Sequence, residues 1–148
     1  MIGDHDRAHV LAEAEAFCQQ RGGRLTRGRR TVLDLLLQAP RPLTAYEVLD
    51  LLRPNDTSAT PASVYRSLDF LLEHGLVHRL ETTRAYVACG HPDHPHAGQF
   101  LICRRCGTVV ETEDARVTAA TDQLGQRLGF VLDQRTVELT GVCGSCQA

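Results

Sequence analysis

The spacing of hydrophobic residues in the first half of the chain predicts four helices. Apolar side chains recur every three or four positions in four segments, which are residues 6–20, 27–39, 45–53 and 61–74. Thr44 and Glu47 have the spacing of a capping box at the start of the third segment. Thr60 can cap the fourth helix, because Pro61 follows it at the first helical position.

A β-hairpin is predicted directly after the fourth helix. Residues 76–80 and 84–88 have strand patterns and flank a short turn at 81–83. Short helices followed by a hairpin are the order of a winged helix-turn-helix, a pattern that other small helical domains share. Residues 1–88 are therefore expected to form a winged-helix domain.

The second half of the chain has a mixed pattern of strands and a helix, and a segment rich in Gly and Pro separates it from the first half. Residues 89–98 hold two Pro and two Gly, and neither a helix nor a strand pattern continues through them, so we interpret them as a hinge. The elements predicted beyond the hinge are strands at 99–103 and 108–112, a helix at 114–128 and a β stretch at 130–139. The inward residues expected on that helix are Val117, Ala120, Leu124 and Leu128. Residues 99–148 are thus predicted to be a small α/β domain, and the fold class is α+β.

Composition narrows the function classes. The chain has 148 residues, and neither half is large enough to bury an extensive core, so metal binding or dimerisation would help to stabilise each half. No apolar run approaches the length of a membrane span, and the N-terminus lacks a signal-peptide pattern. We therefore expect a cytoplasmic protein with no membrane association. In that compartment CxxC pairs favour metal sites over disulfides.

The charge distribution favours nucleic-acid binding by the first half only. The formal net charge is −2, but five arginines lie within residues 21–30. Residues 24–88 carry nine Arg against seven Asp and Glu, whereas residues 89–148 carry five against seven. A local basic surface in the first half would supply the affinity for a polyanion.

The fourth predicted helix has an outward face that suits DNA. Arg66 can make a bidentate contact to guanine O6 and N7, and Tyr65 or Tyr46 can pack on thymine methyls or reach phosphate. The arginines before Thr31 can contact the DNA backbone. The alternative interpretation is a solvated polar face, which composition alone does not distinguish from a DNA-binding one.

Four cysteines form two CxxC pairs, Cys103/Cys106 and Cys143/Cys146. Each pair places two thiolates on one side of a tight turn, and four thiolates are the ligand set of a structural zinc site. An accidental set of buried cysteines is the alternative, which two such pairs in one chain disfavour. Thioredoxin-like redox chemistry needs one pair in a βαβ context that this segment lacks. We expect a closed zinc site that holds structure and performs no chemistry.

A second group of metal-binding side chains lies in the hinge. The group is Cys89, His91, His94 and His96. From the residues alone, a Gly/Pro segment with three His can equally be a solvated loop. His78, on the same face of the hairpin as Leu76 and Leu80, would ordinarily satisfy a hydrogen bond in a core, and Glu111 is an ordinary strand residue by itself.

These residues together resemble the ferric uptake regulator superfamily of bacterial metal-sensing repressors, over nearly the whole chain. The motifs that carry the resemblance are Leu25-Thr26 ahead of Arg29, Thr44-Ala45-Tyr46, residues 61–68 and the two CxxC pairs. Within the superfamily the chain looks most like the zinc uptake regulator branch, on residues 46–53, 69–73 and 86–89.

The resemblance implies a DNA-binding winged-helix domain, a C-terminal dimerisation domain and Zn²⁺ as the cofactor, with one structural and at least one regulatory ion per subunit. The implied structural ligands are Cys103, Cys106, Cys143 and Cys146, and the implied regulatory ligands are His78, Cys89, His96 and Glu111. The implied DNA contacts are Tyr46, Tyr65, Arg66, Arg27 and Arg29. Asp50 and Arg53 match positions through which neighbouring dimers contact each other on DNA. His91 and His94 have no firm counterparts and are either alternative ligands or surface residues.

The resulting hypothesis is a zinc-responsive transcriptional repressor and not an enzyme. It predicts a homodimer that binds double-stranded operator DNA, as one or two dimers per operator, when zinc fills the regulatory site at the hinge, and so silences zinc uptake genes. The alternatives are a sibling sensor for iron, manganese, nickel or peroxide, and a zinc-storage or chaperone protein. An enzyme would require an open metal position with a general base in a substrate pocket, for which no motif is present.

Overall fold

The computed structural model of the chain describes residues 4–89, 97–133 and 135–148. Packing divides the chain into two compact units, Met1–His94 and Pro95–Ala148, and each is described by itself. None of the helices within these described residues is long and apolar enough to cross a membrane.

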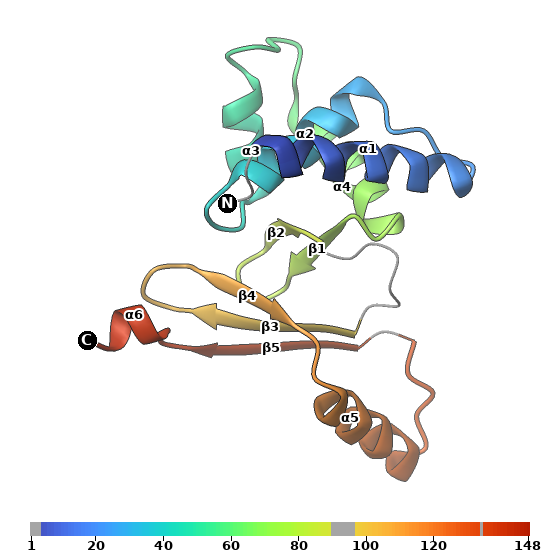
Figure 1. Cartoon of the computed structure of the whole chain (residues 1–148), viewed down its shortest axis with the longest axis vertical. Helices are drawn as coiled ribbons and strands as arrows, with labels where there is room; N and C mark the ends of the chain where they lie inside the picture. Colours follow the sequence, from blue (N-terminus) through green and yellow to red (C-terminus); the bar gives the residue numbers. More distant parts are fainter. Residues whose placement is uncertain (1–3, 90–96, 134) are drawn as a thin grey trace. The chain divides into compact units, whose positions relative to one another are not determined.

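The first unit contains the four predicted helices followed by the predicted hairpin (Figure 1). Its elements are α1 (Asp4–Gln20), α2 (Arg27–Gln38), α3 (Ala45–Leu52), α4 (Pro61–Glu73), β1 (Val77–Leu80) and β2 (Ala85–Ala88). The capping box at Thr44 is present, because the Thr44 side chain accepts from the Glu47 amide while the Thr44 amide donates to the Glu47 carboxylate at 2.8 Å. Thr60 caps α4 in the same way through Ser63. The helix prediction from local sequence is confirmed.

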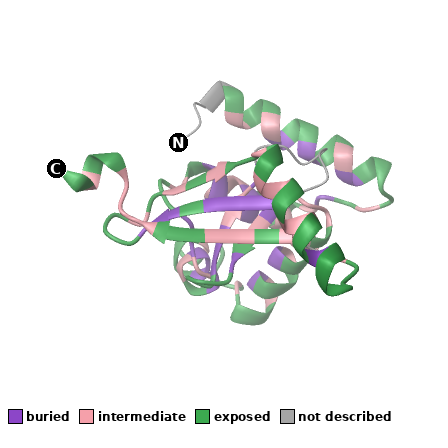
Figure 2. Cartoon of the chain, turned by 90° about the horizontal axis from the view of Figure 1, so that it is seen from below, coloured by how far each residue is buried: buried purple, intermediate pink, exposed green. Residues whose placement is uncertain are grey.

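A single hydrophobic core holds the first unit together (Figure 2). Its most deeply buried residues come from α1, α2, α3 and α4, and they include Cys18, Val32, Leu33, Val48, Leu49, Val64, Leu68 and Leu71. The hairpin joins this core through Leu43, whose amide and carbonyl both hydrogen-bond to the backbone of Tyr86, at 3.1 and 2.8 Å. Since Leu43 lies just before Thr44, the N-cap of α3, this pairing fixes the hairpin against the helix-turn-helix. The winged-helix architecture is therefore confirmed.

The second unit is a three-stranded sheet with one long helix. Its elements are β3 (Ala97–Cys103), β4 (Val109–Thr112), α5 (Ala115–Leu128), β5 (Arg135–Gly141) and α6 (Gly144–Gln147). Strand β3 lies in the centre, antiparallel to β4 and parallel to β5 (Figure 1). A parallel neighbour requires a crossover connection, which α5 supplies.

The expectation that the apolar stripe of α5 faces a core is wrong for most of its members. Leu124 and Leu128 are 46% and 61% exposed, and Ala120 is exposed as well. Most of the helix is coloured as exposed in Figure 2. The helix contacts the sheet through a polar side instead, where the Gln99 side-chain amide donates to Thr118 Oγ1 at 3.1 Å. Helical periodicity reveals an apolar face but not what covers it, and within the described residues of the second unit Leu124 and Leu128 remain largely exposed.

The β stretch predicted from residue 130 begins only at Arg135. Gly129 adopts a left-handed conformation (φ 76°), and the Phe130 amide donates to the Gly125 carbonyl at 2.8 Å. Phe130 therefore closes the C-terminus of α5 and does not extend a strand. Local β propensity is overridden here by the carbonyl groups that the helix end leaves unpaired.

Candidate metal centres and nucleic-acid interface

Four cysteines converge in the second unit. The sulfur atoms of Cys103, Cys106, Cys143 and Cys146 all lie within 4.8 Å of one another. The sheet explains the convergence, because Cys103 ends β3 opposite Gly141 at the end of β5, and the two strands are parallel. Each CxxC turn thus follows the same edge of the sheet. None of the six cysteines, all of which lie among the described residues, is in a disulfide.

Backbone hydrogen bonds shape both turns before any metal is considered. The Arg104 amide donates to the Gly141 carbonyl at 2.9 Å, which ties the first turn to the strand that leads to the second. Gly107 has φ 75°, a conformation that suits glycine, and its amide donates to the Cys103 carbonyl. The Arg105 guanidinium donates to the Cys146 carbonyl and so links the two turns from the other side. Arg105 and Gly141 support the two turns, and the CxxC spacing in the sequence does not identify them.

The environment of the thiols favours a shared cation. The Cys143 amide donates to Cys103 Sγ at 3.4 Å and is the largest cause of a Cys103 pKa lowered to about 6. Neighbouring thiols, Cys143 first and then Cys106, raise the pKa of Cys146 to about 12. Amide donors therefore favour the Cys103 thiolate, whereas hydrogen bonds to neighbouring sulfur atoms keep the Cys146 thiol protonated. A divalent cation would favour the thiolate form of all four, and a set of four sulfur donors fits zinc.

Two of the predicted regulatory ligands lie together in the first unit. His78 is on β1, and Cys89 follows β2, where its amide donates to the Leu76 carbonyl at 2.9 Å. This pairing brings the ligand atoms of His78 and Cys89 within 4.8 Å of each other. Cys89 is buried and His78 half-buried. The hairpin therefore presents one nitrogen and one sulfur donor side by side, which is a partial transition-metal site.

The remaining predicted ligands lie outside the hairpin. Glu111 lies on β4 of the second unit, opposite Phe100 of β3, and is half-buried. His91, His94 and His96 fall outside the described residues.

The predicted DNA-contacting residues of α3 and α4 are on the surface. Tyr46 and Tyr65 are 62% and 42% exposed, and Arg66 is exposed beside them in sequence. The opposite side of α4 is buried in the core, so one face of the helix packs against the protein and the other faces solvent. Asp50 and Arg53 are exposed at the C-terminal end of α3.

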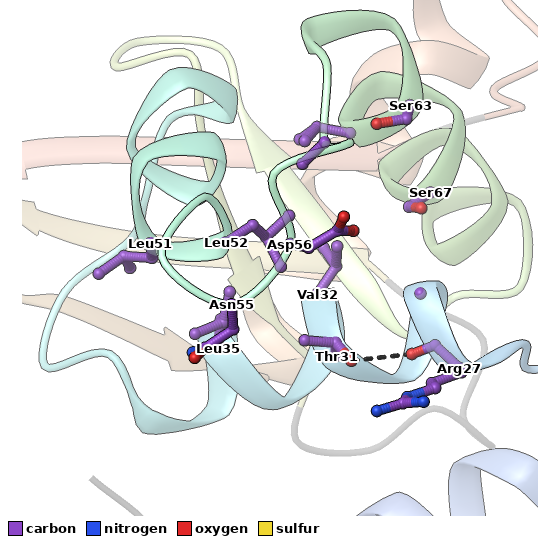
Figure 3. Close-up of a pocket in the computed structure, with 13 residues that line it drawn as sticks. Arg27, Thr31, Val32, Leu35, Leu51, Leu52, Asn55, Asp56, Ser63 and Ser67 are labelled. Carbon is purple, nitrogen blue, oxygen red and sulfur yellow. Dashed lines mark hydrogen bonds between the residues drawn. The ribbon is translucent and has the colours of Figure 1, made fainter.

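The start of α2 lies beside a cavity of about 570 Å³ (Figure 3). Its wall includes Arg27 and Thr31 of α2 and Ser63 and Ser67 of α4. Arg27 is exposed at the rim, and Thr31 Oγ1 donates to the Arg27 carbonyl at 2.9 Å. Arg29 differs from Arg27, because its guanidinium lies over the ring of Phe70.

Comparisons with known proteins agree on one family. The model of the ferric uptake regulator family matches residues 20–140. The zinc uptake regulation protein of Escherichia coli (strain K12) is 43% identical over 138 residues, which cover 93% of this chain and 81% of that protein. A structure of a zinc uptake regulator complexed with zinc and DNA is similar with a TM-score of 0.91 and 42% identity, over 95% of both chains. The crystal structure of holo XcZur is similar with a TM-score of 0.85 and 43% identity, over 95% of this chain and 98% of that one.

Proposed function

The chain belongs to the ferric uptake regulator family, and we propose that it is a zinc-responsive transcriptional repressor that binds operator DNA as a homodimer and silences zinc uptake genes. The observation that carries the proposal is the presence of two donor sets of different chemistry in a chain that also exposes Tyr65 and Arg66 on one face of α4. The four-sulfur set suits a permanent ion, and the mixed set suits one that exchanges.

The structural ion would be held by Cys103, Cys106, Cys143 and Cys146. Zinc bound by four thiolates is coordinatively saturated and supplies folding free energy without catalysis. The proposal is supported by the convergence of the four sulfur atoms and by the backbone hydrogen bonds that shape their turns. We accordingly propose a regulator without enzymatic activity.

The regulatory ion would be held by His78, Cys89, His96 and Glu111, with His91 and His94 as alternative nitrogen donors. A set with one thiolate among nitrogen and oxygen ligands favours zinc over ferrous iron or manganese. These four ligands would come from the hairpin, the hinge and β4. Filling the site would tie these three segments to one ion. Zinc affinity and DNA affinity would then be coupled, and each would raise the other by the same factor.

DNA would be read by Arg66, Tyr65 and Tyr46, with Arg27 on the phosphate backbone. The first turn of α2 contains arginines and no acidic residue, although a helix N-terminus favours negative charge. The positive arginines and the positive end of the helix dipole repel each other. A phosphate would reduce this repulsion and bind both the N-terminus of α2 and Arg27. Asp50 and Arg53 would contact a neighbouring dimer where two dimers share one operator. Arg29, expected from the sequence to touch DNA, has contacts that indicate another role.

The exposed apolar surface of the second unit would be the dimer interface. It includes Leu124 and Leu128 of α5 and the exposed sheet residues Leu101, Val110 and Leu139, which are paired across the three strands. An apolar surface of this kind is unusual on a monomer and typical of an obligate interface. Such an interface would cover the apolar stripe of α5 that is exposed among the described residues.

The test is a mobility shift with a duplex taken from the promoter of a zinc uptake gene. Zinc should promote binding by the wild type, and mild chelation should abolish it. His78→Ala and Cys89→Ser should each lose the zinc dependence, whereas His9→Ala, a change on the exposed face of α1, should behave as the wild type. Equal binding by the His78 variant with and without zinc, at wild-type strength, would contradict the proposal.

The same assay separates the alternatives. Retention of the shift with iron or manganese but not zinc would indicate a sibling sensor. A zinc-storage protein would bind two ions per chain and shift no duplex, but it would leave the exposed Tyr65 and Arg66 without a role.

A further inference from the structure

Arg29 is turned toward the protein and not toward solvent. Its guanidinium carbon lies 3.7 Å from the centroid of the Phe70 ring, and its Nη1 donates to the Arg24 carbonyl at 2.7 Å. Arg27 and Arg30, on the same turn of α2, are exposed, whereas Arg29 is half-buried. The planar face of its guanidinium is therefore occupied by Phe70, and one donor nitrogen is occupied by the Arg24 carbonyl.

Phe70 continues the stack toward the end of α4. Its ring lies on that of His74 with centroids 4.0 Å apart and an interplanar angle of 27°. His74 Nδ1 is 2.9 Å from the Phe70 carbonyl, and because a carbonyl only accepts, Nδ1 carries the hydrogen. The column of Arg29, Phe70 and His74 thus joins the first turn of α2 to the last turns of α4.

The loop between α1 and α2 closes against the same rings. A Cβ added at Gly23 would lie 2.5 Å from His74 Nε2 and 3.3 Å from Phe70 Cζ. A side chain at Gly23 would therefore force the His74 ring to move, and the loop packs against the column from a second side. The contacts of Arg29 and Gly23 with the Phe70 ring set the position of α4 relative to α2. Phe70 lies one helical turn after Arg66.

We infer that Arg29 is a positioning residue for DNA recognition: it holds Phe70 and so sets how α4 presents Arg66, and it makes no phosphate contact. The inference rests on the proposed DNA-binding function. A phosphate contact would require Arg29 to leave the Phe70 ring and the Arg24 carbonyl, while Arg27 already lies exposed at the same helix end.

The test compares salt dependence and specificity in the zinc-loaded full-length protein. The probes are a duplex selected from random DNA by the wild type and a scrambled duplex of the same length. Arg29→Gln and Phe70→Leu should each weaken binding to the selected duplex by about fivefold, the size of a partly buried cation–π contact. Binding to the scrambled duplex should stay within about twofold, and the slope of log K against log salt should not change.

Two comparisons sharpen the result. The double variant Arg29→Gln/Phe70→Leu should bind no more weakly than either single variant, because both changes break one contact. Arg27→Gln serves as the reference for a lost phosphate contact and should reduce the slope by about 0.9 and weaken both duplexes. Should Phe70→Leu fail to fold, Gly23→Ala displaces the same rings without a charge change and should reproduce the specific loss.

Other outcomes would overturn the inference. If Arg29→Gln reduces the slope by about 0.9 and Phe70→Leu or Gly23→Ala binds as the wild type, Arg29 contacts phosphate. If the variants bind the selected and the scrambled duplex more weakly by the same factor, and that factor matches the decrease in folded protein, the column only stabilises the first unit. A wild type that selects no duplex would reject the proposed function as well, so the two failures are distinguishable.

Discussion

Cys103 and Gly141 are directly paired at the ends of the parallel strands β3 and β5. This register places two CxxC turns, separated by 36 residues in the sequence, at one edge of the sheet. A shift of one strand by two residues would move one turn by about 7 Å relative to the other and leave the four sulfur atoms too far apart for one ion. The sheet register and the metal site therefore depend on each other.

Loss of one structural ligand is expected to unfold the second unit. Cys106→Ser should reduce the metal content from two zinc ions per chain to one or none, since the three remaining thiolates bind weakly and the ion supplies folding free energy. Metal analysis combined with circular dichroism measures both effects. Cys18→Ala is the matched control, because Cys18 is buried in the hydrophobic core of the first unit, belongs to neither proposed ligand set and should leave two ions bound.

Glu47 is expected to make the stability of the first unit depend on acid pH. A hydrogen bond from Arg41 at 2.6 Å, and then one from the Thr44 amide, lower the Glu47 pKa from 4.5 to about 2. A folded-state pKa below the unfolded one means that ionised Glu47 stabilises the fold above pH 4.5, and that this contribution is lost as the pH falls through about 2.

The measurement is the free energy of unfolding in urea for the wild type and Glu47→Gln. Because both partners are partly exposed, the variant should be less stable by only about 1 kcal/mol at pH 7, including the weakened capping box. The difference should shrink below pH 4.5. Glu73→Gln, an exposed change at the end of α4, should show no such trend; a constant deficit for the Glu47 variant would contradict the assigned cause.

Two glycines near α2 should respond oppositely to alanine. Gly28 lies in the helix with no atom within 4 Å of an added Cβ, so Gly28→Ala should stabilise the first unit by about 0.5–1 kcal/mol through the better helix propensity. Gly23→Ala forces His74 and Phe70 to move and should destabilise it by about 1–2 kcal/mol. Urea unfolding of both variants checks the sign, and a neutral Gly23→Ala would show that the rings relax without cost.

A charge on the exposed stripe of α5 should dissociate the dimer. Leu128 is exposed in the single chain, so Leu128→Asp should leave the fold intact but raise the dimer dissociation constant by at least about tenfold. Sedimentation velocity over a concentration series measures the shift toward monomer. Gln123→Asp adds the same charge at an exposed polar position of α5 and should remain dimeric. Two variants with the same dimer affinity would place the interface elsewhere.

Local sequence determined the helices of the first unit and the chemistry of the metal ligands. The starts of α3 and α4 follow from Thr44 and Thr60, because a side-chain oxygen pairs with amides only three residues away. CxxC spacing likewise identifies a chelating turn without knowledge of the fold. These features depend on neighbours in the sequence, so the sequence is sufficient to predict them.

Contacts between distant residues decided the rest. Helical periodicity identified the apolar stripe of α5 but not that Leu124 and Leu128 lack a cover, since the same stripe suits a core or an interface. An arginine-rich segment gave no means to separate Arg27 from Arg29, because the difference arises from Phe70, which lies 41 residues beyond Arg29. The two CxxC turns could be named from the sequence, but only the parallel pairing of β3 and β5 brings their sulfur atoms together. Spacing along the chain reports local geometry, whereas burial and side-chain partners are set by packing between elements.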